Sequence, residues 1–356
     1  MWIALSNILY KLTHWESWHY HAKYIPLLPA WLWYCLRSRS LWFFTTSNPG
    51  LTFGGMEGET KEEMYRQMPP GTYPNTIYIS PSSAITDVEQ RISDSNIKYP
   101  LAVKPNVGMM GFMFRKIDSA EDLNKYHQKI PVPYLIQDLI EYPLEVSVFY
   151  YRFPDESKGV ISGFLKKESP FVTGDGVSTL WKLIQALPAV RFKHNEMRLR
   201  HYKKLDLVFP KGEEFHLSNA SNRSQGSKMV GLQHEIDDKL LHLFDRISHY
   251  SGQFFYGRYD IKCVSVNDLK EGKNFSILEF NGSGSGTQHV YGNGNNIFQA
   301  CHIILQHWKM LYKISKYNNE QGVPYWRFLR GLKFLRNAKK NLKMLKTLDA
   351  EFPALQ

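Results

Sequence analysis

Two short stretches decide the fold: GRYDIKC at residues 257–263 and, after a polar turn, ILEFNG at residues 277–282. Both are apolar in the manner of buried strands, yet they carry Asp260, Glu279 and Asn281. On neighbouring strands Asp260 and Glu279 can face each other, and Asn281 lies two residues beyond Glu279 on the same face. Oxygen ligands of this kind suit a hard cation, so we expect one or two Mg²⁺ ions here, with Mn²⁺ as the alternative metal. The open alternative is Asp–Arg or Glu–Lys pairing at a sheet edge, which would also relieve the cost of acids inside apolar strands.

The bulk composition is that of a globular, intracellular protein. With 356 residues, 43% hydrophobic and 22% charged, the chain is long enough for two or three lobes. Its three widely spaced cysteines, Cys35, Cys263 and Cys301, form no metal or disulfide pattern, which favours the cytoplasm. No secretory signal is visible, and the uncharged run 24–36 is too short to span a bilayer. The net charge of +11 indicates a polyanionic partner, either a phosphorylated ligand or an anionic membrane; without a recognised motif, nucleic acid is disfavoured.

The order of elements predicts an α+β fold with antiparallel sheets. Several apolar strands follow one another directly, among them residues 134–140 and 144–151, while helices are expected at 84–95, after Ser119, after Ser178, and at 237–249 and 296–313. Strands are also expected at 75–80, 99–104, 112–117 and 160–168, whereas residues 192–235 read as polar and irregular. Such mixing fits α+β better than a doubly wound parallel sheet.

Three further motifs carry residues suited to a nucleotide. AVKPNVGMMG places Lys104 at a strand end before a loop with Gly108 and Gly111, where a cation and close backbone N–H groups can meet phosphates. IQDLIEYPLEVSV offers backbone groups of a hinge to an adenine edge and a carboxylate to ribose hydroxyls, through Gln137, Asp138, Leu139 and Glu145. Lys61 begins the charged helix KEEMYRQM. Each motif alone is equally explained by solvated surface residues.

Taken in order, these motifs resemble the ATP-grasp superfamily, and most closely its D-alanine–D-alanine ligase branch. The matching segments are TKEEMYRQMPPGTYP, AVKPNVGMMG, IQDLIEYPLEVSV, then GRYD and LEFN. The segments VTGDGVSTLWKLI and HLSNASNRSQGS are similar to parts of cyanophycin-synthetase-like ATP-grasp enzymes. The resemblance covers about residues 55 to 300 and implies two α/β lobes with antiparallel sheets that grip ATP between them.

The resemblance also implies roles for these residues. Lys61 and Lys104 would hold the ATP phosphates beneath the 106–112 loop, and Asp260, Glu279 and Asn281 would bind two Mg²⁺ ions. A substrate carboxylate would attack the γ-phosphorus to give an acyl phosphate, and an amine or a thiol would then attack the acyl carbon, with Arg258 stabilising the oxyanion. Arg223 and Lys228 in the loop NRSQGSK are further candidates for phosphate contact, against the alternative of a solvated basic loop.

The sequence departs from the family in two places. The segment ahead of Lys61 is short, rich in Trp and Arg, and does not resemble the nucleotide-fold-like domain of the ligases. The loop after Asn281 replaces their short Pro-Gly turn by GSGSGTQHVYGNGN, so we expect substrate contacts there, from Ser283, Ser285, Gly286, His289 and Tyr291. For the last two, the alternative is that both are surface residues. The expected division is an aromatic segment 1–54, a small nucleotide-loop subdomain 55–138, a metal-site subdomain 139–315 and a basic helix 316–356.

Both ends of the chain suggest a membrane-facing side. Residues 1–50 contain six tryptophans, and residues 325–348 combine leucines at helical spacing with eight lysines and arginines. An anionic membrane could bind both segments, which would place a cytoplasmic protein at the inner face of the cell membrane. The alternative is a terminal helix packed on the body of the protein with a solvated basic face.

The sequence therefore predicts an ATP- and Mg²⁺-dependent carboxylate–amine or carboxylate–thiol ligase with small-molecule substrates. The alternatives are an ATP-grasp kinase that phosphorylates a hydroxyl, and a membrane-surface binding protein with a vestigial ATP site. The identity of the substrates, the pathway and the oligomeric state stay open.

Overall fold

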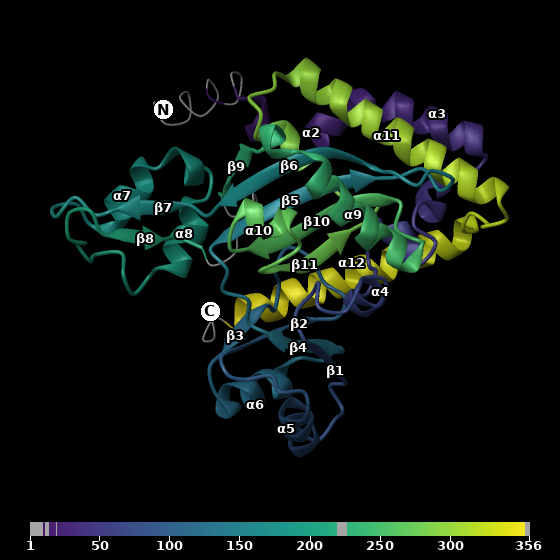
Figure 1. The fold of residues 1–356 in the computed structure, drawn as a ribbon. Coiled ribbons are helices and arrows are strands. Elements are labelled where there is room, and N and C mark those ends of the chain that lie inside the picture. Colours follow the sequence, from purple (N-terminus) through teal and green to yellow (C-terminus); the bar gives the residue numbers. More distant parts are fainter. Residues whose placement is uncertain (1–9, 11–13, 19, 219–225, 353–356) are drawn as a thin grey trace.

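The protein is described here by a computed structural model, which covers residue 10 and residues 14–18, 20–218 and 226–352. Two antiparallel sheets form two lobes, a smaller subdomain projects from the large lobe, and a long C-terminal helix runs between the lobes (Figure 1). This confirms the predicted α+β class with antiparallel sheets.

The small lobe is a four-stranded sheet in the order β1-β4-β2-β3, made of β1 (Thr76–Ile79), β4 (Tyr134–Asp138), β2 (Leu101–Pro105) and β3 (Arg115–Ile117). Helices α5 (Ile85–Asp94) and α6 (Ala120–Lys129) pack on it through an apolar cluster that includes Val88, Leu123 and Ile136. Ser119 caps α6 by accepting from the backbone N–H of Asp122, as predicted.

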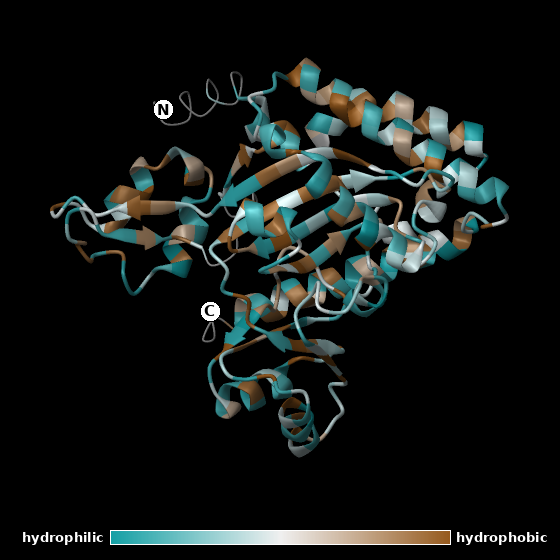
Figure 2. Ribbon diagram, in the orientation of Figure 1, coloured by the Kyte–Doolittle hydropathy of each residue, from teal (hydrophilic) through white to brown (hydrophobic). Residues whose placement is uncertain are grey.

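The large lobe is a five-stranded sheet in the order β11-β10-β5-β6-β9, made of β11 (Phe275–Asn281), β10 (Tyr256–Cys263), β5 (Leu144–Tyr151), β6 (Val160–Glu168) and β9 (Lys228–Gly231). Hydrophobic and hydrophilic residues alternate along its strands (Figure 2), which gives the sheet two different faces. One face packs on α9 (Asp238–Ser251) and α10 (Val266–Lys270) through residues such as Val148, Ile261 and Phe244. The other face is apolar at one end and carries charged side chains at the other.

The aromatic N-terminal segment forms a helical layer on the apolar end of that second face. It contains α2 (Tyr20–Tyr24), α3 (Leu28–Ser38) and short 3₁₀ turns at Trp15–Ser17, Ile25–Leu27, Phe43–Thr46 and Thr52–Gly55. Phe43 and Phe44 pack with Phe149 of β5 and with Leu311 of α11 (Ile297–Glu320), which lies beside α3 in Figure 1. The capping box at Asn296 and Gln299 fixes the predicted start of α11, and the helix continues beyond the predicted end at residue 313 to Glu320.

The projecting subdomain corrects one sequence prediction. Part of the region 192–235, predicted to be irregular, forms α8 (His194–Arg200), β8 (Glu214–His216) and β9. α8 and β8 belong to the projecting subdomain together with β7 (Phe171–Thr173), α7 (Leu180–Ala186) and the turn Pro188–Val190. β9 instead joins the large sheet and is followed by the turn Gln233–Glu235. A separate core that includes Leu180, Val190 and Met197 holds the subdomain together, and its widely spaced apolar residues hide the pattern in the sequence. The N-cap of α7 is Thr179 rather than the predicted Ser178.

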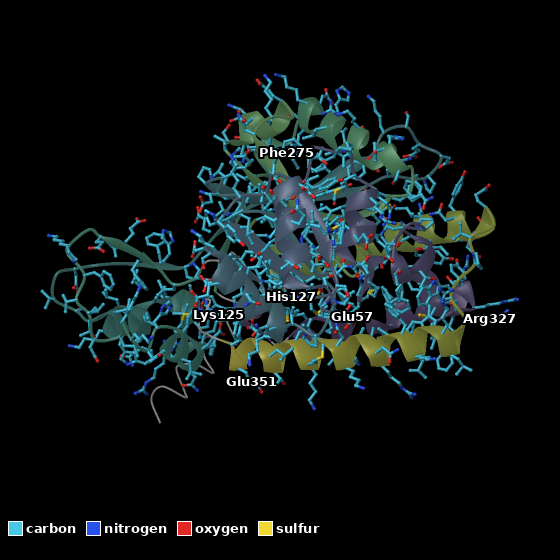
Figure 3. The ribbon with its side chains drawn as sticks, turned by 90° about the horizontal axis from the view of Figure 1, so that it is seen from below. Glu57, Lys125, His127, Phe275, Arg327 and Glu351 are labelled. Carbon is cyan, nitrogen blue, oxygen red and sulfur yellow. The ribbon has the colours of Figure 1, made fainter. Side chains whose placement is uncertain are left out.

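The last helix, α12 (Phe328–Glu351), contacts both lobes (Figure 3). Leu345 is fully buried in the small-lobe core, whereas Phe334 and Leu335 pack with the N-terminal layer of the large lobe. Asp349 pairs with the buried Arg115 of β3 at 2.8 Å and accepts from the backbone N–H of Met113 at 2.8 Å. Residues 325–348 therefore follow the packed alternative, because the protein itself covers much of the apolar side of the helix.

Two smaller observations complete the fold. The strand predicted at 112–117 begins only at Arg115, because Met113 adopts a left-handed backbone conformation (φ 58°) that ends the preceding turn. None of the described helices combines the length and the apolar composition needed to cross a bilayer.

Candidate nucleotide and metal site between the lobes

The charged end of the large sheet places the two predicted metal-binding strands side by side. β10 and β11 are antiparallel neighbours, and Asp260 lies opposite Glu279 in register, as the sequence predicts. Arg258 lies opposite Asn281, and on the other side of β10 Asp260 faces Ser147 of β5. A β-bulge at Asp260/Ile261 lets Glu279 and Asn281 share this face while Ile277 packs in the core.

Asp260 is the centre of a closed hydrogen-bonding network. Arg258 donates to both of its carboxylate oxygens, at 3.0 and 2.9 Å, and Lys167 lies 3.0 Å from Oδ1. The Ser147 hydroxyl and the Asn281 amide also donate to it. Burial would raise the pKa of Asp260, but the charges of Arg258 and Lys167 outweigh burial and hold that pKa far below its usual range. Its carboxylate is therefore ionised and occupied by protein donors, which is the alternative of Asp–Arg pairing that the sequence left open.

Lys167 is a member of this network that the sequence analysis missed. Its side chain is 3% exposed and also lies 3.2 Å from Glu145, the residue predicted to hold ribose. The only available signal was a lysine pair inside the strand VISGFLKKE, where alternation turns one lysine inward.

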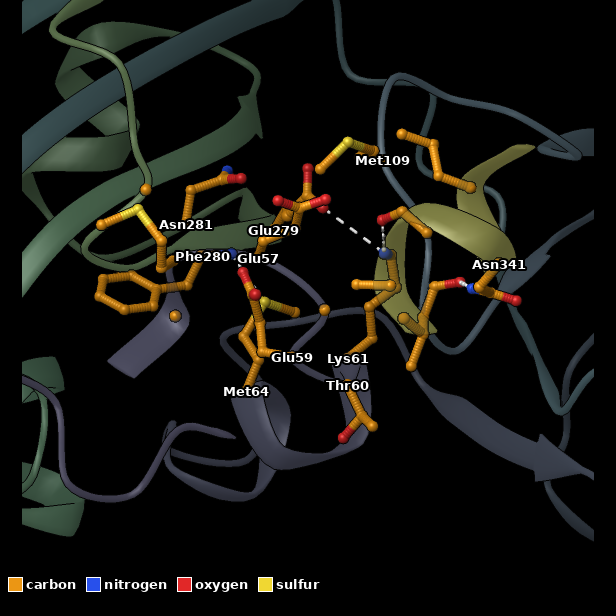
Figure 4. Close-up of a pocket in the computed structure, with 18 residues that line it drawn as sticks. Glu57, Glu59, Thr60, Lys61, Met64, Met109, Glu279, Phe280, Asn281 and Asn341 are labelled. Carbon is orange, nitrogen blue, oxygen red and sulfur yellow. Dashed lines mark hydrogen bonds and ion pairs between the residues drawn. The ribbon is translucent and has the colours of Figure 1, made fainter. Parts of the chain in front are cut away.

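Glu279 has a different environment from its neighbour across the strands. Its side chain is 37% exposed and lies 3.5 Å from Lys61, which begins α4 (Lys61–Arg66). It lines a pocket of about 110 Å³ together with Asn281, Gly108 and Lys61 (Figure 4). The pocket thus brings together side chains from β11, α4 and the 106–112 loop, as the resemblance implies.

Two acidic residues of the pocket were not singled out from the sequence. Glu57 and Glu59, two apart in GGMEGET, line it beside Glu279 (Figure 4). Burial raises the pKa of Glu59 to about 7, and the Glu279 carboxylate adds to the rise. Glu59 Oε2 is buried and has no hydrogen-bond partner among the described residues. In the sequence, the available signal was that Glu57 and Glu59 are two residues apart, as are Glu279 and Asn281.

The second predicted phosphate-binding lysine lies deeper. Lys104 Nζ donates to Tyr65 Oη and to the carbonyl of Leu278, both at 3.1 Å, and burial lowers its pKa to about 8. Lys61 Nζ donates to the carbonyl of Gly108 at 3.0 Å, so it contacts the loop that contains the predicted glycines. Gly111 has a left-handed backbone (φ 77°), which a residue with a Cβ adopts only at a cost.

The 106–112 loop is held from two sides. Asn106 accepts from the backbone N–H groups of Lys61 and Glu62 through its carbonyl and its side chain, and Asn341 of α12 donates to the carbonyl of Val107 at 3.3 Å. Asn341 and Leu342 also line the pocket. The C-terminal helix is therefore part of the pocket wall, which no motif in the sequence indicated.

The hinge residues lie where the two sheets meet, at the end of β4 and the start of β5. The buried Gln137 donates its side chain to Thr76, and the backbone N–H of Asp138 donates to Asn75. Leu139 follows beyond the strand end. None of these three residues, nor Glu145, lines the pocket.

The predicted substrate loop divides into two parts. Ser283 and Ser285 lie next to the pocket residue Gly284, and the carbonyl of Gly286 accepts from Arg258 at 3.1 Å. The Ser283 hydroxyl is buried without a hydrogen-bond partner among the described residues. None of Ser283, Ser285 and Gly286 lines the pocket itself, so their contact with a substrate stays a prediction.

Neither His289 nor Tyr291 lines the pocket; His289 is buried, whereas Tyr291 is partly exposed. His289 is 3% exposed and packs beside His307 and Phe149, and burial, with Arg258 nearby, lowers its pKa to about 4. Tyr291 stacks on Trp15 at 5.3 Å. For His289, which is buried, the alternative of a surface residue is therefore wrong; Tyr291 packs on Trp15 but keeps a partly exposed side chain.

The remaining candidates are placed elsewhere. Lys228 is exposed on the edge strand β9, opposite Glu168, and does not line the pocket. Arg223 lies outside the described residues. The basic loop thus gives no support to the predicted phosphate contact.

The residues of the pocket fit a hard cation in part. Asn281 donates its amide N–H to Asp260, which leaves the amide oxygen for a ligand, and Glu279 and Glu59 supply carboxylate oxygens without strong protein donors. The described residues contain no preformed group of three or more His, Cys, Asp or Glu side chains at metal-binding distances. To bind a cation here, the carboxylates of Glu279 and Glu59 would have to move closer together. A bound ligand that supplies oxygen atoms of its own could complete the coordination of that cation.

Comparison with known proteins gives a resemblance in fold. No protein-family model and no curated protein matches the chain. Among solved structures, it is similar to a D-alanine–D-alanine ligase from Bacillus anthracis (13% identity, 74% of this chain and 69% of the ligase, TM-score 0.42). It is also similar to a bifunctional glutathione synthetase from Pasteurella multocida (14%, 68% and 34%, TM-score 0.38) and to the ATP-grasp ligase PsnB (13%, 67% and 55%, TM-score 0.35). At these sequence identities and TM-scores, the similarity does not indicate an activity.

Proposed function

We propose that the chain is an ATP- and Mg²⁺-dependent ligase that joins a small carboxylic acid to an amine or a thiol through an acyl phosphate. The observation that carries the proposal is the pocket between the lobes, where three separate motifs converge: one contributes Lys61, one Gly108, and one Glu279 and Asn281. These motifs occur in the order that ATP-grasp enzymes share.

The residues present fit the parts of such a reaction. Glu279, Asn281 and Glu59 would hold Mg²⁺, whose charge would offset the negative charge of the transferred phosphoryl group. Lys61 and Lys104 would bind phosphate oxygens. Arg258, fixed by Asp260, keeps one guanidinium nitrogen on the carbonyl of Gly286 and would donate from there to the oxyanion formed when the amine attacks.

The pocket is too small for ATP as it stands. Ligand pockets usually have volumes of about 300–1,000 Å³, whereas this one has about 110 Å³. Binding therefore requires the 106–112 loop to move away from Lys61 and α12, which breaks the contacts of Gly108 and Val107. Movement of this loop is also what closure over bound phosphates would require.

The test is ATP turnover with pools of amino acids and carboxylic acids, read as ADP and a mass-shifted product. With hydroxylamine present, a ligase gives a hydroxamate from the trapped acyl phosphate, whereas a kinase gives ADP and a phosphorylated hydroxyl compound. The hydroxamate supports the proposal. A phosphorylated alcohol, or no turnover with any pool, overturns it.

A matched pair of variants locates the activity. Glu279→Gln should lower ATP turnover roughly a hundred-fold or more, because the pocket loses a carboxylate proposed to bind Mg²⁺. Glu271→Gln, at an exposed residue paired with Lys273, is the control and should leave turnover unchanged. Equal turnover in both variants would contradict the site.

A further inference from the structure

An apolar stripe lies on the outside of the N-terminal helical layer. Ile25, Leu28, Leu32 and Leu36 are spaced by three and four residues and are 65%, 47%, 48% and 72% exposed. Residues at this spacing share one face of a helix. The adjacent Trp33 is also exposed, so a continuous run of large apolar side chains faces solvent along the length of α3.

The stripe is not required for packing of the layer. The inward side of the same helix carries Trp31 and Cys35, which pack in the core of the N-terminal layer or against α11, and Leu27 just before the helix is also buried. α3 is therefore apolar on two sides, of which only one is used inside the protein. An exposed apolar face of this kind marks an interaction site more often than chance.

The surroundings of the stripe are cationic. Residues 17–56 contain no Asp or Glu, and Arg37 and Arg39 are exposed at the C-terminal end of α3. Arg37 also lies over the ring of Trp33 at 5.7 Å. The nearby acid at the end of α11, Glu320, is paired with Lys316 at 3.1 Å.

The start of α12 extends the same surface. Trp42 donates its ring N–H to the carbonyl of Phe328 at 3.1 Å, which places this end of α12 beside the segment that follows α3. Phe328 and Leu329 are 53% and 74% exposed. Residues 321–348 contain eight lysines and arginines and no acid, so apolar tips and basic residues are again combined.

We propose that α3 and the first turn of α12 bind the surface of an anionic phospholipid bilayer, with α3 lying in the plane of the interface. Aliphatic side chains and a tryptophan would enter the boundary between headgroups and acyl chains, while the arginines contact lipid phosphates. Charge complementarity favours a membrane as the partner of this surface. Basic side chains next to an apolar stripe match anionic headgroups that lie above the hydrocarbon of a bilayer. The surface lies apart from the pocket residues, so the proposal does not depend on the ligase proposal.

The test is co-sedimentation of the full chain with vesicles, without ATP. Vesicles of phosphatidylcholine alone are compared with vesicles that also contain phosphatidylglycerol, at low and high salt. We expect binding only to the anionic vesicles and weaker binding at high salt, because salt screens surface charge. Equal binding to both kinds of vesicle, or binding to neither, overturns the proposal.

Three variants assign the surface. The double variant Leu32→Ser/Leu36→Ser should bind anionic vesicles at least about ten-fold more weakly, and Arg37→Gln/Arg39→Gln should lose roughly five-fold for each charge removed. Leu199→Ser, at a 77% exposed leucine of α8 in the projecting subdomain, is the matched control and should bind as the unchanged protein does. Unaltered binding in both double variants overturns the assignment.

Self-association is the competing outcome. All of the substituted side chains are exposed, so thermal unfolding of the variants should match that of the unchanged protein. Sedimentation velocity that shows a dimer of the unchanged chain and a monomer of Leu32→Ser/Leu36→Ser, with no vesicle binding by either, would identify the stripe as an interface between copies and overturn the membrane proposal.

Discussion

Asp260 and Glu279 face each other across two neighbouring strands, yet they lie in opposite environments. Asp260 accepts hydrogen bonds from Arg258, Lys167, Ser147 and Asn281, whereas Glu279 has one long contact with Lys61 and opens to the pocket. The same chemical group thus stabilises the sheet in one position and is available to a ligand in the other. The strand register predicts that the two carboxylates lie opposite each other. Which of them is available to a ligand depends on the hydrogen-bond donors that surround each one.

The comparison is tested most strongly by removing the Asp260 carboxylate. Asp260→Ala leaves the buried Arg258 without its paired carboxylate and Lys167 with Glu145 alone, so we expect a loss of about 3–5 kcal/mol in the free energy of unfolding. Denaturant unfolding measures it. Glu279→Gln, in the same assay, should change stability by less than about 1 kcal/mol because its ion pair with Lys61 is long and partly exposed. Similar losses in both variants would remove the distinction.

The pocket side of the comparison depends on α12. Leu345→Ala deletes a fully buried side chain between this helix and the small lobe, and should cost about 2–5 kcal/mol of stability. Leu329→Ala, on the same helix at 74% exposure, is the control and should cost little. If both variants unfold at the same denaturant concentration as the unchanged protein, α12 does not hold the pocket wall.

The free energy of unfolding should also depend on pH, through two buried histidines of the large lobe. The pKa of His289, about 4, lies below the ordinary value near 6.5 of an unfolded chain, and burial lowers the pKa of the neighbouring His307 as well. The unfolded state therefore binds more protons between these values, and stability falls as pH falls below about 6.5.

For each histidine the loss approaches about 1.4 kcal/mol per pH unit within that window. His289→Gln/His307→Gln should flatten the dependence between pH 6.5 and 4.5, as measured by denaturant unfolding at each pH. An unchanged slope would mean that neither histidine is held neutral in the folded protein.

Much of the fold was readable from the sequence because local patterns and packing agree. The strands Leu144–Tyr151 and Val160–Glu168 were predicted to the residue, and the register of Asp260 with Glu279 follows from period two. Ser119 and Asp237 cap their helices where polar residues precede apolar periodicity. These features depend on neighbours in the chain.

The rest could not be predicted because it depends on contacts between distant segments. Lys167 neutralises Asp260 from a strand that is nearly a hundred residues away in sequence, and nothing local marks it as a partner. The sequence of 325–348 left open whether this helix binds a membrane or packs on the protein, because the burial of Leu345 and the Arg115–Asp349 pair appear only in three dimensions. For the same reason deletion of residues 325–356 would test folding rather than membrane binding.

The segment that leads into α4 and the loop that follows β11 approach each other backbone to backbone. The N–H groups of Ser283 and Gly284 donate to the carbonyls of Gly54 and Gly55, and a Cβ on Gly55 would lie 2.8 Å from the Cα of Gly282. Glu57 and Glu59 line the pocket from the segment that leads into α4, and Asn281 lines it from the end of β11. Formation of the pocket is therefore cooperative across more than two hundred residues of sequence, and amide hydrogen exchange at Ser283 and Gly284 would report its opening as a single event.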